Sequence, residues 1–356
     1  ASQGGRSDGG AQEYKDATFY YQTLLDKKPC NYNALSKLIF LLRRAGRLRD
    51  APRYLTAAEK ACVRSPDQET GLRFCRGTYN RWVNKPQDAL VELNFARRDP
   101  DYRADALVHM IEIYLNPDAN AGLEALDSSA EPSMDHLREV DNLIKELSVA
   151  QKQAWNSRLK VYQCQSLLFT KQKANVERGL NQLMDLYNDK KDYIPTLLAM
   201  SQGLVIQKQV TKARNQLKRI ADLAKKGYNP EFMDDFERAW LLLAEIYIQS
   251  SKYDLASSLC HLAKDHNRSC GKAWEQLGLI YEKEQSYKDA AQHYEKAWEF
   301  CNESSPSVGY RLAFNYLKAK RYVVAINICQ QVLKISENYP KIKKDVLDKA
   351  RAMLRS

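Results

Sequence analysis

Apolar side chains recur at a fixed interval in the second half of this chain. Trp240, Leu243, Tyr247, Tyr253, Ala256 and Ala263 are matched 34 positions later by Trp274, Leu277, Tyr281, Tyr287, Ala290 and Ala297. Within each set, spacings of three, four and seven residues are those of one face of a helix. Large side chains fall on the first helix of a set and mostly small ones on the second, so the pattern predicts a repeated pair of helices.

A period of 34 residues is the length of the tetratricopeptide repeat, a unit of two antiparallel helices called A and B. Neither helix can bury its apolar face alone, so neighbouring units must stack to form a core. The sequence therefore predicts an all-α fold, a tetratricopeptide-repeat α-solenoid. The predicted packing contacts are made by Trp240, Tyr247, Ala256, Trp274, Leu277, Gly278, Tyr281, Ala290, Ala297 and Ala325.

A small residue marks helix B of each recognisable repeat, at a point where helix axes are expected to approach closely. These residues are Ala17, Ala51, Ala89, Gly179, Ala213, Ala256, Ala290 and Ala325. The solenoid is expected over 14–338, interrupted by an insertion loop at about 116–132 and an inter-repeat loop at about 225–234, both with Pro and Gly. Residues 339–356 alternate charged and apolar positions at helical spacing, which predicts a C-terminal capping helix.

The front of the chain differs from the rest. Residues 1–13 are rich in glycine, which destabilises helices, so we expect a flexible or divergent segment there. The first recognisable helix is a helix B without its helix A. Further repeats are therefore expected upstream.

No motif for catalysis or cofactor binding is present. The chain has no Gly-rich phosphate loop, no Gly-x-Ser-x-Gly and no His-Glu-x-x-His, so we predict no enzyme and no cofactor. Cys260, His261, His266 and Cys270 form the one group that resembles metal ligands. We expect them on different faces of a helix and on the turn that follows it. Because a structural zinc ion needs four ligands that converge on one point, we predict no metal site.

Charge and cysteine usage limit the class of partner. Lysine and arginine exceed aspartate and glutamate by 11, a balance compatible with nucleic acid or an anionic membrane. The basic residues are dispersed over many predicted helices without a recognition motif, so no nucleic acid is expected, and membrane contact is left open. The eight cysteines are scattered without a Cys-x-x-Cys pair, which is typical of a reduced, cytosolic chain.

The concave surface of such a solenoid is lined by helix A, chiefly at its fifth and ninth positions. Here these positions are largely apolar, and none holds the Asn or Lys with which co-chaperones of this fold grip a terminal carboxylate. A long apolar surface is unstable in water; it either binds a segment of a partner or is buried by neighbouring turns of the superhelix. We interpret it as a partner groove formed by Phe40, Phe74, Leu168, Leu198, Leu241, Leu279, Tyr310 and Phe314.

Several longer strings resemble one family of repeat proteins. They are NYNALSKLIFLLRRAGRL (31–48), MIEIYLNPD (110–118), TKQKANVE (170–177), KARNQLKRIA (212–221), WLLLAEIYIQSSKYDLA (240–256), HNRSC (266–270), LAFNYLKAKRY (312–322) and YPKIKKDVLDKARAMLR (339–355). These strings are similar to the C-terminal region of the tetratricopeptide repeat protein 21 family. They include surface positions that the generic repeat leaves free, and they extend over nearly the whole chain after about residue 14.

This resemblance implies a non-catalytic scaffold of intraflagellar transport complex A, which supports retrograde ciliary transport and membrane-protein trafficking. The implied partners are WD-repeat/tetratricopeptide subunits and a small disordered subunit of that complex, with an indirect link to dynein-driven trains. The implied location is the cilium or flagellum, the ciliary base and the cytoplasm, with the cytoskeleton. Two alternatives are a generic tetratricopeptide-repeat adaptor or co-chaperone, and a basic RNA-associated repeat protein.

Overall fold

The computed structural model describes residues 7–62, 65–116, 123, 126, 133–150 and 156–355. Throughout these ranges the regular structure is helical and no strand occurs. The chain divides into two compact units, the first made of residues 1–216 with 267–269 and the second of 217–266 with 270–356. Each unit is a succession of helices joined by short turns, so the prediction of an all-α solenoid is confirmed.

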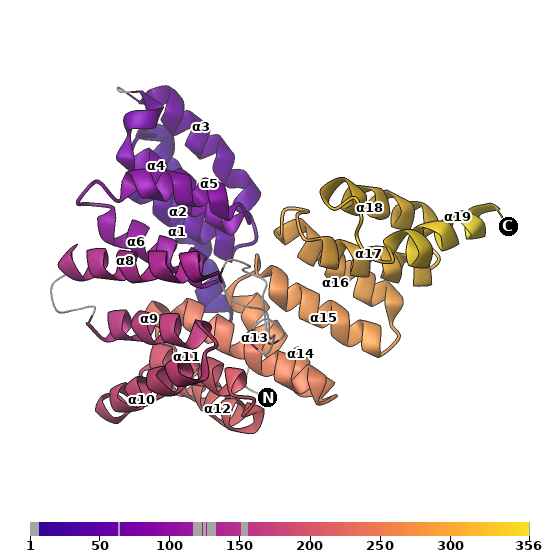
Figure 1. Cartoon of the computed structure of the whole chain (residues 1–356). Helices are drawn as coiled ribbons and strands as arrows, with labels where there is room; N and C mark the ends of the chain where they lie inside the picture. The colour runs from indigo at the N-terminus through magenta and orange to yellow at the C-terminus, as the bar shows by residue number, and fades with distance from the viewer. Residues whose placement is uncertain are drawn as a thin grey trace. The chain divides into compact units, whose positions relative to one another are not determined.

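Helix pairs follow one another through both units (Figure 1). Those beginning in the first unit are α1 (Ser7–Lys27), α2 (Tyr32–Arg44), η1 (Leu48–Asp50), α3 (Ala51–Ala61), η2 (Pro66–Gln68), α4 (Thr70–Trp82), α5 (Pro86–Ala96), α6 (Arg103–Leu115), α8 (Met134–Ala150), α9 (Asn156–Phe169), α10 (Lys173–Asp189), α11 (Ile194–Ile206) and α12 (Val210–Lys226). The second unit continues with η3 (Pro230–Phe232), α13 (Met233–Gln249), α14 (Tyr253–His266), α15 (Gly271–Lys283), α16 (Tyr287–Phe300), α17 (Pro306–Lys318), α18 (Tyr322–Ile335), η4 (Lys343–Leu347) and α19 (Asp348–Arg355).

The turn between helices A and B has the same backbone form in most repeats. One residue adopts a positive φ of 56–74° at Gly46, Asn84, Lys171, Lys208, Ser251, Gln285 and Lys320. At every one of these turns except that of Lys171, the N–H of the residue that follows bonds back into helix A, as from Lys252 to the Tyr247 carbonyl at 2.8 Å and from Ser286 to the Tyr281 carbonyl at 2.9 Å. This is the Schellman ending of a helix, usually made with glycine, so the repeats impose the left-handed conformation mostly on residues that do not favour it.

Most of the small residues of helix B occupy the predicted close approaches, whereas Ala17 is only half-buried. Ala51, Ala89, Ala213, Ala256 and Ala290 have no exposed surface. At the corresponding Gly179, a Cβ atom would meet Leu168 Cδ2 at 3.2 Å and the Cys164 carbonyl at 3.3 Å. The helices are therefore separated by the width of a small side chain.

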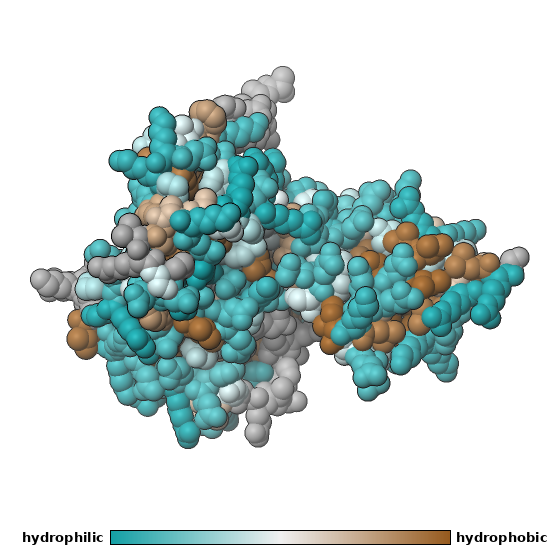
Figure 2. Space-filling view, turned by 90° about the horizontal axis from the view of Figure 1, so that it is seen from above, coloured by the Kyte–Doolittle hydropathy of each residue, from teal (hydrophilic) through white to brown (hydrophobic). Residues whose placement is uncertain are grey.

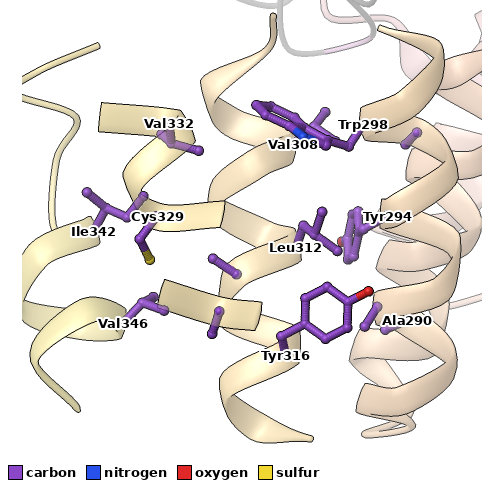
Figure 3. Close-up of a cluster of buried hydrophobic side chains, with 14 of the residues drawn as sticks. Ala290, Tyr294, Trp298, Val308, Leu312, Tyr316, Cys329, Val332, Ile342 and Val346 are labelled. Carbon is purple, nitrogen blue, oxygen red and sulfur yellow. The ribbon is translucent and has the colours of Figure 1, made fainter. Parts of the chain in front are cut away.

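The core at the C-terminal end of the second unit is built in layers (Figure 3). Tyr294 of α16 lies against α17, and Cys329 of α18 lies between α17 and the chain that follows. Ile342 and Val346, in the segment after Pro340, are completely buried against this cluster. The predicted capping helix is confirmed, although it begins with the π-helical turn η4 before α19.

The start of the first helix differs from the expected boundary. Helix α1 begins at Ser7, so residues 7–13 are helical and do not form a separate loop. Extending an existing helix costs less than nucleating a new one, which is why Gly9 and Gly10 are tolerated there. The predicted insertion loop at 116–132 lies almost entirely outside the described residues, whereas the loop at 225–234 contains the end of α12, the short η3 and the start of α13.

Candidate interaction surfaces

The eight residues predicted to line a groove fall into two groups. Phe40, Leu241, Leu279, Tyr310 and Phe314 are half-buried and offer surface. Phe74, Leu168 and Leu198 are buried, with exposed fractions of 6%, 0% and 1%. The groove prediction is therefore wrong about the accessibility of these three side chains.

Each of the three is buried for a local reason. Phe74 stacks on Tyr102 with ring centroids 5.3 Å apart. Leu168 fills the space left by two glycines, since a Cβ at Gly203 would meet its Cδ2 at 2.9 Å. Leu198 lies on α11, a helix that is buried on nearly all faces.

A row of cationic and aromatic side chains instead follows helices α2, α4 and α6 of the first unit. Phe40 and Trp82 lie 6.1 Å apart between centroids, and Trp82 meets His109 edge to face at 6.2 Å. The Arg43 guanidinium lies 4.9 Å from the Trp82 ring centroid and that of Arg44 lies 5.3 Å from Phe40. Cations over ring faces are attracted to the π-electrons, so this arginine–aromatic row is ordered before any partner arrives.

The row continues into an ion-pair cluster around Glu112. Arg81 reaches its Oε2 at 2.5 Å, and Arg158 reaches its Oε1 at 3.4 Å. Tyr162 donates a hydrogen bond to the same Oε1 at 3.0 Å, and Arg81 also contacts His109. One largely buried carboxylate therefore holds α4, α6 and α9 together.

Sequence reasoning missed Trp82, Arg81 and Arg43 because they lie outside the fifth and ninth positions of helix A. The signal that could have identified them is the Arg-Trp pair at the end of α4, facing the Arg-Arg pair that ends α2.

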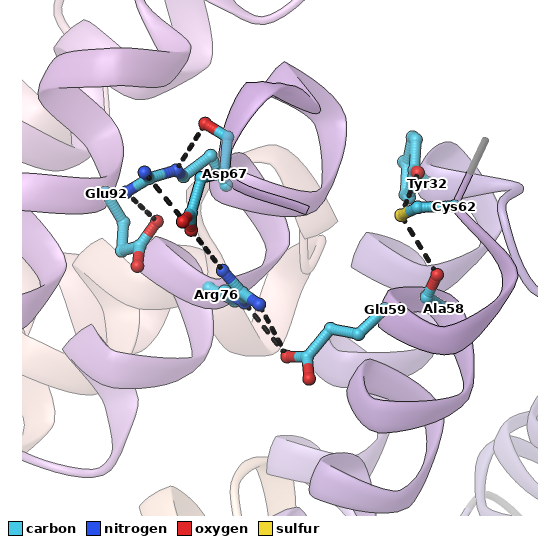
Figure 4. A network of polar contacts seen from close by, with 8 residues as sticks. Tyr32, Ala58, Glu59, Cys62, Asp67, Arg76 and Glu92 are labelled. Atoms are coloured by element: carbon cyan, nitrogen blue, oxygen red, sulfur yellow. Dashed lines mark hydrogen bonds and ion pairs between the residues drawn. The ribbon is translucent and has the colours of Figure 1, made fainter. Parts of the chain in front are cut away.

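A second polar network fixes the loop around η2 (Figure 4). Arg73 bridges Glu92 at 3.1 Å and Asp67 at 3.5 Å, and Arg76 bridges Glu59 at 2.8 Å and the same Asp67 at 3.7 Å. Asp67 is mostly exposed, so its pairs are screened by water and contribute little. The pairs to Glu59 and Glu92 tie α4 to α3 and α5.

Cysteines differ in chemical environment between the surface and the core. Tyr32 Oη lies 3.4 Å from Cys62 Sγ, and the Cys62 thiol donates to the Ala58 carbonyl at 3.1 Å (Figure 4). Cys30 lies close to both and is exposed. Burial raises the pKa of the Cys260 and Cys329 thiols to about 12, so both are protonated and unreactive at neutral pH.

The second unit carries an aromatic face on α17 and the chain that follows α18. Tyr310 lies 6.5 Å from Phe314 and 5.7 Å from Tyr339 between centroids, and Lys318 Nζ lies 5.5 Å from the Phe314 ring. Tyr339 was not among the predicted groove residues, because it follows the last helix pair. These side chains are half-buried and form the accessible part of the predicted groove in this unit.

A network of polar contacts joins α15, α16 and α17. The buried Asn315 donates from Nδ2 to Glu282 Oε2 at 2.7 Å and to the Arg311 carbonyl at 2.8 Å. Arg311 donates to Tyr294 Oη at 3.4 Å. Burial raises the pKa of Tyr294 well above its ordinary value, despite the opposing effect of the Arg311 charge.

The four side chains that resemble metal ligands do not converge. Cys260 is buried and donates to Gln276 Oε1 at 3.3 Å, His261 lies 3.1 Å from Lys264 Nζ, and His266 stacks on Tyr228 at 4.5 Å. Within the described part of the chain, no three His, Cys, Asp or Glu residues are grouped so that they could hold a metal ion. Nor does any described helix have the length and apolarity to cross a bilayer.

Two family models match the chain. The tetratricopeptide repeat protein 21 C-terminal ARM domain matches residues 139–351, and the TT21 fifth ARM repeats domain matches residues 10–115. The chain belongs to the tetratricopeptide repeat protein 21 family. The resemblance seen in the sequence is thereby confirmed over both units.

Curated members of this family are similar along almost the whole chain. Human tetratricopeptide repeat protein 21B is 48% identical over 332 residues, which is 90% of this chain and 25% of the relative. Mouse tetratricopeptide repeat protein 21A is 42% identical over 354 residues, 97% of this chain and 27% of the relative. The Caenorhabditis elegans homolog is 33% identical over 355 residues, 97% of this chain and 26% of the relative. The chain thus spans about a quarter of the length of these relatives.

Among solved structures, the human IFIT1 dimer with m7Gppp-AAAA has a TM-score of 0.48 and 12% sequence identity. The similar region covers 95% of this chain and 79% of that one.

Proposed function

We propose that this member of the tetratricopeptide repeat protein 21 family is a non-catalytic scaffold segment of intraflagellar transport complex A. In this role it supports retrograde ciliary transport and the trafficking of ciliary membrane proteins. The observation that carries the proposal is the family membership of both units, with 48% identity to a human member over 332 residues.

The surfaces described above are suited to such a role. The arginine–aromatic row of the first unit and the aromatic face of the second combine cations with half-buried rings, and aromatic and arginine side chains dominate the binding energy of protein interfaces. We propose as partners the WD-repeat/tetratricopeptide subunits and the small disordered subunit of the complex. A disordered partner can wrap an extended surface of this kind.

The proposed location is the cilium or flagellum, the ciliary base and the cytoplasm, in association with the cytoskeleton. The link to dynein-driven trains would be indirect, through the complex. Membrane contact by this segment is not needed for the scaffold role.

Gentle extraction of the tagged full-length protein from ciliated cells tests the proposal. We expect recovery together with the other complex A subunits, and failure to recover them would overturn it. A Tyr310→Ala/Phe314→Ala variant tests the aromatic face separately. It should reduce recovery at least ten-fold, since truncating a hot-spot residue at the centre of an interface costs about 2 kcal/mol or more.

The matched control is Phe19→Ala, which removes an exposed aromatic ring from α1. It should leave recovery unchanged, and circular dichroism should show equal helicity in all variants. Equal recovery of both variants would exclude the aromatic face as the docking site, while the scaffold role would stand.

A further inference from the structure

Most of the net positive charge of this chain arises in one short region. Residues 318–355 hold ten lysines and arginines against three acidic residues, an excess of seven out of the chain's eleven. All ten basic side chains are exposed. Asp345, one of the three acidic residues, lies 3.9 Å from Lys349. This end of the second unit therefore presents a strongly basic surface.

The same region exposes large aliphatic side chains. On α18, Val323, Val324 and Ile335 are 59%, 37% and 47% exposed, and on α19 Met353 and Leu354 are 52% and 49% exposed. Figure 2 shows apolar side chains gathered over this end of the second unit among polar ones. Single exposed apolar residues are ordinary, whereas a group of this kind marks an interaction site.

Part of this group lies along one face of α18. Val324, Ile328 and Ile335 follow one another at intervals of four and seven residues, which keeps them on one side of the helix over about 16 Å. The core of the unit takes different residues of α18, namely Ala325, Cys329 and Val332, all without exposed surface. In the apolar stripe formed by Val324, Ile328 and Ile335, Ile328 also packs against this core, whereas Val324 and Ile335 are exposed.

Helical spacing of the stripe fits a helix laid against it, because amphipathic helices bind through residues at three- and four-residue intervals. The basic surroundings select a partner with acidic flanks. A second copy of this surface would bring like charges together. A membrane is less suited, since interfacial membrane helices carry Trp, Phe or Leu on their apolar face, whereas the stripe along α18 consists of valine and isoleucine.

We propose that the face formed by α18 and α19 docks an acidic amphipathic helix of a partner protein. Apolar residues of that helix would cover Val324, Ile328 and Ile335, and its carboxylates would pair with lysines such as Lys343 and Lys344. This face lies on helices other than those that carry the arginine–aromatic row. Docking of such a helix goes beyond the proposed scaffold role, and the test of this docking does not depend on which complex the protein joins.

Fluorescence anisotropy with the purified chain tests this docking. The probe is a labelled 18-residue peptide with leucines on one helical face and glutamates on the other. A peptide of the same composition with its sequence scrambled is the control for amphipathicity. We expect the first peptide to bind with an affinity that falls as salt rises, and the scrambled peptide to bind at least ten-fold more weakly.

Two variants locate the site. Val324→Ser/Ile335→Ser makes the two exposed residues of the stripe polar and leaves Ile328, which also packs against the core. Lys343→Glu/Lys344→Glu reverses the flanking charge. Each double variant should weaken binding at least ten-fold without loss of helicity. The matched control, Lys218→Glu/Lys225→Glu on α12, makes the same charge change at exposed positions elsewhere and should weaken binding less than three-fold.

Equal binding of the scrambled peptide, or equal weakening by the control variant, would overturn the proposal. So would binding to vesicles containing phosphatidylserine without binding to the peptide, which would identify a membrane surface instead. Recovery with complex A in cells is a separate readout. Its failure would leave the peptide result standing.

Discussion

Gly309 lies inside α17 at a point where no side chain fits. A Cβ atom there would meet Trp298 Cζ3 at 2.7 Å and Cη2 at 2.9 Å, and it would also contact Val332 Cγ2. Ordinary carbon contacts are about 3.5–4.0 Å, so the added methyl group overlaps the ring by nearly 1 Å. Trp298 and Val332 are both buried, which leaves them little room to move.

Two effects of Gly309→Ala oppose each other. Alanine favours the helix by about 1 kcal/mol relative to glycine, while overpacking a filled core costs about 1–3 kcal/mol. Because the new methyl group meets both the Val332 Cγ2 methyl and the rigid Trp298 indole ring, and both side chains are buried, we expect the second effect to win. The predicted net loss is up to about 2 kcal/mol in the free energy of unfolding of the second unit.

Hydrogen exchange followed by mass spectrometry measures this loss locally. Amides of α17 and α18 should exchange up to about thirty-fold faster in the variant. The matched control is Gly227→Ala, where an added Cβ meets nothing within 4 Å and a gain of about 0.4–1 kcal/mol is expected. The reasoning is refuted if Gly309→Ala protects α17 as well as, or better than, the parent chain.

A companion variant tests the identity of the clashing partner. Val332→Ala removes one of the two side chains that the new methyl group meets. In combination with Gly309→Ala, the double variant should be more stable than the sum of the two single losses, by about 1 kcal/mol. Strict additivity would show that the two residues do not touch.

Three further predictions concern charge and reactivity. Glu112→Gln removes a largely buried carboxylate from two arginines and should lower the free energy of unfolding by urea by about 3 kcal/mol. The control Asp135→Asn, in an exposed ion pair, should not change it measurably. Equal losses in the two variants would contradict the burial of Glu112. Iodoacetamide at pH 8 should label Cys30 in the native chain and leave Cys329 unlabelled until the chain is denatured. Peptide mass mapping measures both. Labelling of Cys329 in the native chain would show that the core opens. Burial and a neighbouring lysine lower the pKa of His261 in the folded chain, so protonation of this residue favours the unfolded state. Its contribution to stability should therefore be lost as the pH falls through the pKa of the unfolded chain, near 6.5. An NMR titration midpoint above 6.5 in the folded chain would contradict this.

The sequence by itself determined the helix pairs and their order. Trp240 and Trp274, 34 residues apart, mark the same place in two successive repeats, and the column of small residues from Ala51 to Ala325 lies at the close helix approaches. Such features are local, because the spacing of residues along a helix defines which of them share a face. The strings that resemble the tetratricopeptide repeat protein 21 family likewise needed no structure.

Tertiary structure alone decided which apolar residues remain accessible. Phe74, Leu168 and Tyr310 occupy equivalent or neighbouring columns of helix A, yet the first two are buried and the third is half-exposed. Ile335 of α18 is apolar and still exposed. Periodicity states which way a side chain points from its own helix, whereas burial depends on what lies opposite, and that neighbour can come from a distant part of the chain.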